Sequence, residues 1–260
     1  MLKNSFIFDN IAYLTRRLGL SYLIVTVIII SSCTLTGTLY EDIDPEPEPP
    51  SELPKMTFRT NLHGEVSIEI MGTGSITIDW GDRSTARTHT ISNTSSFQRI
   101  YSNANSRTIT ITGENITRMN LSDNQISRLD VSEISTLVHL LCYGNNLEGL
   151  LDLSGNILLQ TLLCHDNLLT GLNVSSCVDL RILNCGANMI TNLVMTNNTV
   201  LEYLDCSFNN MSASSLSILL SSLHGNTIPD GKTIFMNDNP GTETSLNKDI
   251  AKSNGWTVVE

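Results

Sequence analysis

Cysteine and histidine are the side chains of this 260-residue chain that could do metal or nucleophilic chemistry. Four of the six cysteines recur at intervals of 22, 21 and 21 residues: Cys142, Cys164, Cys185 and Cys206. The segment Cys164-His165-Asp166 even contains the residue types of a nucleophilic triad. In a strand, however, neighbouring side chains point to opposite faces, which would separate this thiol from the imidazole. The sequence also has no phosphate-binding loop, zinc signature or nucleophile elbow. We therefore expect no enzymatic activity, no cofactor and no metal site.

The cysteine spacing belongs to a longer repeat that begins at Ile116. The units read ITRMNLSDNQISRLDVSEIST, LVHLLCYGNNLEGLLDLSGNIL, LQTLLCHDNLLTGLNVSSCVD, LRILNCGANMITNLVMTNNTV and LEYLDCSFNNMS. Each follows L-x-x-L-x-C/L-x-x-N-x-L/I/M, and the second has one extra residue near Leu151. This pattern closely resembles the leucine-rich repeat family, over residues 115–211. The resemblance implies a right-handed solenoid with one short parallel strand per repeat.

The repeat assigns the cysteines to the core. Positions 4 and 6 lie two residues apart on a strand and must face inward, because one repeat cannot bury its apolar face alone. The cysteines occupy position 6 and form a line with steps of about 5 Å, whereas zinc needs four converging ligands. We expect four buried thiols, and a half-buried thiol at Cys177 in the turn after Val174. Position 9 is asparagine in every unit and is expected to bond to the backbone of adjacent turns: Asn124, Asn145, Asn167, Asn188 and Asn209.

Positions 3, 5 and 7 face away from the core, on the concave strand surface. Leucine, isoleucine and aromatic side chains gather there on neighbouring rungs, although that surface should be wet. Contiguous apolar patches with a polar rim mark interaction sites, so these positions are the candidate partner-binding site. We call eight of them the concave site: His139, Leu141, Tyr143, Leu163, His165, Ile182, Tyr203 and Asp205. Strand propensity alone, or coverage by neighbouring elements, is the alternative explanation.

The N-terminal 32 residues are expected to be an export signal. Basic residues precede the apolar run LGLSYLIVTVIII, and Ser31-Ser32-Cys33 follow it, an order typical of secretory signals. The ending Ile30-Ser31-Ser32-Cys33 resembles the lipobox of bacterial lipoproteins, which implies a lipid such as palmitate on Cys33 and an anchor in the cell envelope, at the outer membrane. An uncleaved transmembrane anchor and an ordinary cleaved signal remain alternatives. Residues 33–55 include EDIDPEPEPPSELPK, whose prolines and acids predict an extended spacer.

Residues 56–114 predict a small β-domain. Six segments alternate apolar and polar side chains, which is typical of half-buried strands in an antiparallel sandwich. Ile78-Asp79-Trp80-Gly81-Asp82, with the later Tyr101, resembles PKD-type sandwich domains. Arg83 stands where that family usually has a second glycine, and no His-Thr-Tyr precedes Tyr101. A calcium site at Asp79 and Asp82 is conceivable, but turn hydrogen bonds from Asp82 and a core role for Trp80 explain the motif better.

The regular repeat is expected to stop after Asn210, and residues 212–260 predict a C-terminal α/β cap. A helix capped by Ser212 and stopped by Gly225, and a second helix at 245–253, alternate there with strands at Lys232–Met236 and Trp256–Val259. The expected fold is therefore mainly β with short helices, and comprises a sandwich, a right-handed solenoid and this cap. A further partial rung is expected at 234–239.

The net charge limits the classes of partner that this chain is expected to bind. Acids outnumber bases 26 to 15, which disfavours nucleic acid. We expect a recognition or adhesion lipoprotein that binds a protein or glycan with its concave face and the membrane through Cys33. A glycan-binding or envelope-assembly accessory protein, relying on exposed aromatics of the β-domain, is the second hypothesis.

Overall fold

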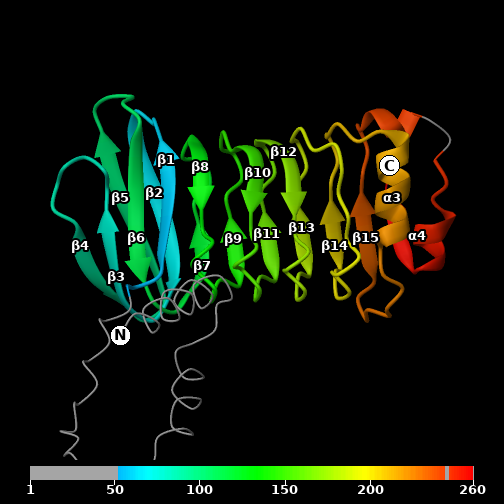
Figure 1. Ribbon diagram of the computed structural model, residues 1–260, viewed down its shortest axis with the longest axis horizontal. Coiled ribbons are helices and arrows are strands. Elements are labelled where there is room, and N and C mark those ends of the chain that lie inside the picture. The colour runs from blue at the N-terminus through cyan, green and yellow to red at the C-terminus, as the bar shows by residue number, and fades with distance from the viewer. Residues whose placement is uncertain (1–51, 244–245, 260) are drawn as a thin grey trace, which may run out of the picture. The chain divides into compact units, whose positions relative to one another are not determined.

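The computed structural model describes residues 52–243 and 246–259, and residues 52–260 form one compact unit (Figure 1). The expected signal, the lipid site at Cys33 and most of the acidic spacer lie outside the described residues. Within the compact unit, two layers of strands enclose one continuous hydrophobic core. The chain is mainly β with a few short helices, as its repeats and alternating segments predict.

Six strands form the N-terminal part, and each coincides with a predicted segment. They are β1 (Lys55–Thr60), β2 (Gly64–Gly72), β3 (Gly74–Asp79), β4 (Arg87–Ile91), β5 (Thr94–Tyr101) and β6 (Arg107–Gly113). Every second side chain of β2 and β6 is buried, because one face of each strand packs on the core. All pairings among these six strands are antiparallel, as expected for a sandwich.

The solenoid follows with two strands in each early repeat. One layer contains the short parallel strands of the repeats: β7 (Ile116–Asn120), β9 (His139–Leu141), β11 (Thr161–Leu163), β13 (Ile182–Asn184) and β14 (Tyr203–Asp205). The opposite layer contains β8 (Ile126–Asp130), β10 (Glu148–Asp152) and β12 (Leu168–Asn173). The strands therefore recur as the rungs that the 21-residue repeat predicts.

Both layers run without a break from the sandwich into the solenoid. The nine-stranded sheet has the order β16-β15-β14-β13-β11-β9-β7-β2-β5, and β2 pairs antiparallel with β7. The five-stranded sheet has the order β4-β3-β6-β1-β8, and β1 pairs antiparallel with β8. The first repeat thus has its exposed backbone edges covered by the sandwich, which acts as the N-terminal cap that a solenoid needs. The domain boundary between 114 and 115 stays a prediction.

Asparagine side chains tie each rung to the next, as predicted for position 9. In the third repeat, Asn167 Oδ1 accepts from Leu147 N at 2.9 Å, and Asn167 Nδ2 donates to the carbonyls of Cys142 and Cys164. Asn145, Asn188 and Asn209 make the same set of bonds on their own rungs. The ladder satisfies backbone groups that leave the strands inside the core.

The four column cysteines have no exposed surface and no disulfide, which confirms their assignment to the core. Burial raises the pKa of Cys142 and of Cys185 to about 12. The prediction for Cys177 was wrong, because this thiol is fully buried. It stands in a second inward column with Asn156 and Asn198, and both asparagines donate to carbonyls of the preceding rung.

The C-terminal part continues the solenoid instead of only covering its end. Its elements are α3 (Ala213–Ser222), β15 (Lys232–Phe235), the 3-10 helix η2 (Pro240–Glu243), α4 (Asp249–Ser253) and β16 (Trp256–Val259). Strands β15 and β16 add to β14 in parallel, and Asn239 extends the asparagine ladder to the Cys206 carbonyl. The expected partial rung is therefore confirmed, and the expectation that the repeat stops after Asn210 was wrong.

The first helix of this part begins as predicted, with Ser212 Oγ accepting from Ser215 N. It ends at Ser222, before the expected Gly225 stop, because its cap residue Leu223 is already extended and buried. The second helix is shorter than the predicted 245–253.

Candidate functional site

The concave site lies on one face of the nine-stranded sheet, where the register stacks its residues in columns. Column three aligns Arg118, His139, Thr161, Ile182 and Tyr203 on successive strands, and column five aligns Asn120, Leu141, Leu163, Asn184 and Asp205. The inward neighbours of these positions, such as Leu140 and Leu162, are completely buried. The two faces are thus separated as strand geometry requires. All eight predicted residues lie on this outer face, within or directly after the strands.

In column five, Leu141 and Leu163 stand where three other rungs carry asparagine or aspartate. The Oδ1 atoms of Asn120, Asn184 and Asp205 each accept a hydrogen bond from the backbone N–H two residues later, at 3.0 to 3.1 Å. This local bond holds the chain as it leaves the strand. Leu141 and Leu163 cannot accept such a bond, so the two middle rungs lack this local stabilisation and present apolar surface instead. Strand propensity alone does not explain why leucine replaces these hydrogen-bonding side chains on two neighbouring rungs.

An aromatic pair borders the leucines. The rings of Tyr143 and His165 stack with centroids 4.6 Å apart and planes 10° apart. His165 Nδ1 is buried without a hydrogen-bond partner in the described chain, and His165 Nε2 lies 3.8 Å from Asp166 Oδ2. The two nearly parallel rings make a flat surface beside Leu141 and Leu163.

The far end of the site contains a residue that the eight predicted ones do not include. Phe235 of β15 aligns with Asp205 in column five, and its ring packs against Tyr203 with centroids 5.5 Å apart. The sequence could have identified Phe235, because the expected partial rung at 234–239 places residue 235 in column five. From β9 to β15 the apolar surface crosses four strand spacings, or about 19 Å.

In columns three and five, the charged side chains Arg118 and Asp205 stand on either side of the apolar residues. Burial and the nearby Arg118 guanidinium lower the pKa of His139, which favours its neutral form. Burial and the Asp205 carboxylate raise the pKa of Tyr203. Arg118 Nε in turn lies 3.9 Å from Glu69 Oε1 of β2. The strand positions from Leu141 to Ile182 carry no acidic or basic side chain, and Arg118 and Asp205 flank them.

The residues with catalytic or metal-binding types do not converge. Cys164 is buried in the core whereas His165 lies on the outer face, so the apparent triad is split as expected. Across residues 52–243 and 246–259, no group of three His, Cys, Asp or Glu side chains could hold a metal ion. None of the helices described for this chain is long and apolar enough to cross a membrane.

The acidic turn of the N-terminal part has a structural role. Asp79 Oδ1 accepts from Gly81 N, and Asp82 Oδ1 accepts from Ser84 N at 3.0 Å. Arg99 Nε donates to Asp82 Oδ2 at 2.7 Å. Hydrogen bonds from Ser84 and the Arg99 charge hold the pKa of Asp82 at about 2. Trp80 lies in the core, so the explanation by turn chemistry and packing is confirmed.

Comparisons with known proteins give a partial likeness. No family model matches the chain, and no curated protein matches it. Three solved structures from Listeria monocytogenes resemble it. The functional domain of InlJ, described as including a cysteine ladder, is 26% identical and the match covers 52% of this chain and 32% of that chain, with a TM-score of 0.40. Internalin InlF is 17% identical, the match covers 49% of this chain and 42% of that chain, and the TM-score is 0.33. Internalin C2 is 20% identical, the match covers 56% of this chain and 72% of that chain, and the TM-score is 0.34.

This chain matches less than half of the InlJ and InlF chains. The leucine-rich-repeat architecture is therefore assigned from its own repeats, rungs and asparagine ladder.

Proposed function

We propose that this protein is a non-enzymatic recognition lipoprotein of the bacterial cell envelope, and that its concave site binds a protein partner. The observation that supports this most strongly is column five, where Leu141 and Leu163 replace residues that stabilise the neighbouring rungs. At these positions the stabilising hydrogen bond has been exchanged for partly exposed apolar surface beside a stacked aromatic pair. Rigid aromatic side chains around a small apolar centre, with polar residues at the rim, are typical of binding hot spots.

The size of the site fits the centre of a macromolecular interface. The apolar surface is about 19 Å long and, from column three to column seven, about 13 Å wide. That corresponds to roughly 250 Å², about a third of the 800 Å² that each partner contributes to a stable complex. Arg118, Asn184 and Asp205 would supply the polar rim.

A lipid on Cys33 and a location at the outer membrane complete the proposal. They rest on the lipobox-like ending Ile30-Ser31-Ser32-Cys33 and on the acidic spacer after it, which would hold the folded unit away from the membrane. Protease treatment of intact cells tests the surface-exposed form of this proposal. Removal of the folded unit supports adhesion or recognition at the cell surface, and protection in intact cells rules it out.

The second hypothesis, glycan binding by the β-domain, loses its main support. It depends on exposed aromatic side chains, but Phe58, Trp80 and Tyr101 are buried and Phe97 is half-buried. A glycan would need to stack on the Tyr143–His165 pair of the concave site instead.

Photo-crosslinking in the bacterium tests the proposed site and captures the partner in the same experiment. A benzophenone amino acid replaces Leu163 in one variant and Val178, which is 50% exposed outside the site, in a matched control. We expect a crosslinked protein of discrete mass from position 163 alone, and its loss when Leu141→Glu is added. Equal crosslinking from both positions, or none from position 163, would refute the proposal.

A further inference from the structure

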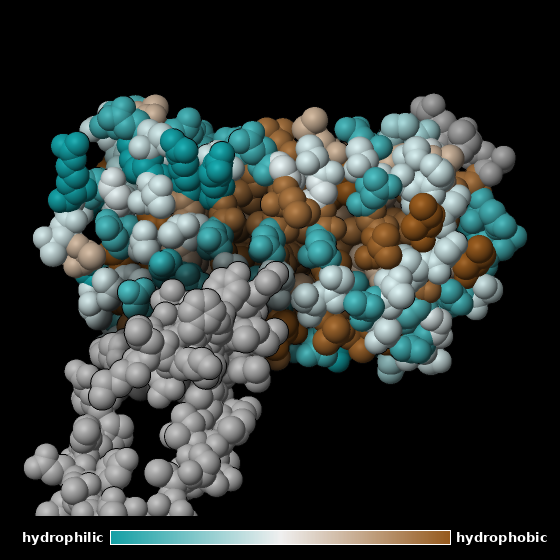
Figure 2. Space-filling model, viewed as in Figure 1, coloured by the Kyte–Doolittle hydropathy of each residue, from teal (hydrophilic) through white to brown (hydrophobic). Residues whose placement is uncertain are grey.

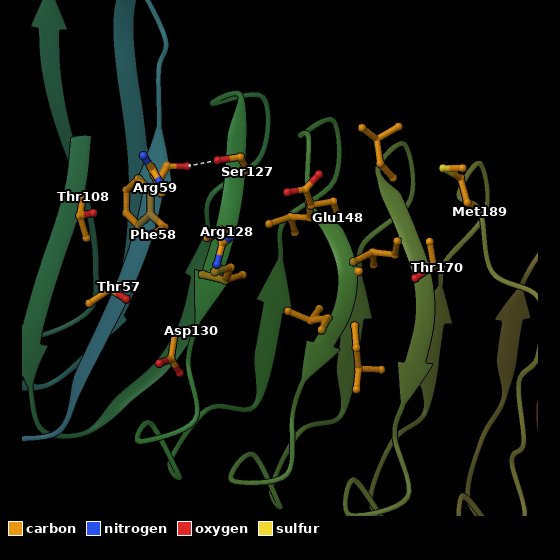
Figure 3. A pocket seen from close by; sticks show the side chains of 17 residues that line it. Thr57, Phe58, Arg59, Thr108, Ser127, Arg128, Asp130, Glu148, Thr170 and Met189 are labelled. Carbon is orange, nitrogen blue, oxygen red and sulfur yellow. Dashed lines mark hydrogen bonds between the residues drawn. The ribbon is translucent and has the colours of Figure 1, made fainter. Parts of the chain in front are cut away.

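A second surface lies on the other layer of the molecule, between β8 and β10. Here exposed side chains of both walls, together with core residues such as Phe58 and Leu151 beneath them, line an open groove of about 900 Å³ (Figure 3). Its walls come from β1 and β8 on one side and from β10 and β12 on the other. We call it the β8–β10 groove. None of its lining residues belongs to the concave site.

The groove originates in the one repeat that has an extra residue. Asn146 N donates to the Ile126 carbonyl at 2.9 Å, but β10 then pairs with β12 and not with β8. The register shifts between Gly149 and Leu150, and Gly149 has a φ of +76°, a conformation that favours glycine. The register shift leaves Thr170 of β12 without a partner on β10, and β10 and β8 form no ladder, so the strand pairing of this layer is interrupted at the groove.

The surface of the groove is apolar on the β10 and β12 side. The side chains of Leu150, Leu168 and Met189 are 65%, 48% and 44% exposed, on three successive repeats. Figure 2 shows hydrophobic surface over β10 and β12. Residues of the concave site are more sheltered, with Ile182 at 37%. Exposed, flexible leucine and methionine side chains on adjacent rungs are typical of surfaces that adapt to a partner.

The opposite wall has an unusual charge pattern. Arg59 of β1 and Arg128 of β8 stand directly opposite each other in the antiparallel register. Like charges in such a position are unfavourable. Arg59 Nε donates to Ser106 Oγ at 2.6 Å, whereas the Arg128 side chain has no hydrogen bond or ion pair within the described chain. Glu148 and Asp130 also line the groove, yet neither pairs with these guanidinium groups.

We propose that the β8–β10 groove binds an extended segment of a partner protein that carries an acidic side chain close to apolar ones. The carboxylate would be held by Arg59 and Arg128, where it relieves their mutual repulsion. The apolar side chains would lie on Leu150 and Leu168. Arg128 of β8 and Leu150 of β10 both line the groove, so one short extended segment that lies in it meets the guanidinium group and the apolar wall together.

Selection of short random peptides displayed on phage tests this proposal with the full chain. Selected peptides are then labelled and titrated against four variants. Arg128→Glu and Leu150→Glu alter the groove. Arg83→Glu, in an exposed loop, and Ile157→Glu, at a 53% exposed position, are matched controls that make the same changes elsewhere. Circular dichroism verifies that each variant is folded.

We expect enriched peptides with an acidic residue close to apolar residues, and an affinity that falls at least about tenfold in both groove variants but not in the controls. No enrichment, enrichment without acidic residues, or affinity unchanged in the groove variants would overturn the proposal. Leu163→Glu separates the two surfaces, since it should leave peptide binding intact. Loss of peptide binding in that variant would overturn the assignment to the groove while leaving the concave site standing.

Two other occupants would also overturn it. One is anionic lipid, detected as binding to phosphatidylglycerol vesicles that Arg128→Glu abolishes while selected peptides do not compete. The other is a second copy of the chain, detected as a dimer in sedimentation velocity that Leu150→Glu dissociates.

Discussion

Replacing Asn167 by alanine should destabilise the solenoid more than its small loss of volume implies. Asn167 is buried, and its side chain makes four hydrogen bonds to the backbone of two rungs. The carbonyls of Cys142, Cys164 and His165 keep other donors in the variant, from Asn145, Asn188 and Gly144 in that order. The N–H of Leu147 has no other acceptor and would be left unsatisfied inside the protein.

The expected loss in the free energy of unfolding follows from these hydrogen bonds. An unsatisfied buried N–H costs about 1–3 kcal/mol, and the weakened bonds to the carbonyls add roughly 1 kcal/mol. The free energy of unfolding should therefore fall by about 2–4 kcal/mol, a large part of the 5–15 kcal/mol typical of folded proteins. Asn173→Ala is the matched control, because exposed Asn173 accepts only from Ser175 N and water can replace it. We expect a loss of less than about 1 kcal/mol for that variant.

Urea denaturation followed by circular dichroism measures both values on the full chain. The midpoint should shift for Asn167→Ala with little change in slope. Equal midpoints for the two variants would refute the view that the asparagine ladder holds the rungs together.

Three further predictions concern the core, the acidic turn and the rungs. The five described cysteines should not react with Ellman's reagent in the native protein and should all react in urea. Burial raises the pKa of Cys142 from 9.0 to about 12, so unfolding releases protons at high pH. The free energy of unfolding should therefore fall as the pH rises above 9. Asp82→Asn should lower the melting temperature at pH 7 but not near pH 2, since the folded pKa is about 2 and the stabilisation is lost as pH falls through it; an equal loss at both pH values would contradict this. Gly155→Ala should cost about 2 kcal/mol or more, because its Cβ would lie 1.9 Å from the Ser132 carbonyl oxygen, and a smaller loss than for Gly149→Ala in thermal melts would contradict that rung contact.

The architecture was predictable because the repeat encodes it. Side-chain alternation located all six N-terminal strands, and one asparagine per repeat located the ladder. The extra residue near Leu151 was visible as well, but its consequence was not. The missing ladder between β8 and β10 and the register shift beside Gly149 depend on backbone geometry, which the repeat pattern does not specify.

Other features depend on contacts between distant segments. Cys177 looked like a turn residue, yet it is buried because Asn156 and Asn198 stand above and below it in one column. Continuity of the sandwich with the solenoid needed the pairing of β2 with β7, which no local pattern reveals. For the candidate site, the sequence located all eight residues on one face, but their degree of exposure and the Tyr143–His165 stack required coordinates.

The affinity of the partner crosslinked at position 163 tests the central claim most directly. The purified partner is titrated against the unmodified chain, Leu163→Glu and the matched Val178→Glu by calorimetry. Loss of a buried leucine worth about 2 kcal/mol predicts at least a roughly 30-fold weaker affinity for Leu163→Glu. Val178→Glu should bind like the unmodified chain. Equal affinities for all three proteins, with the fold intact, would contradict the claim that the concave site holds the partner.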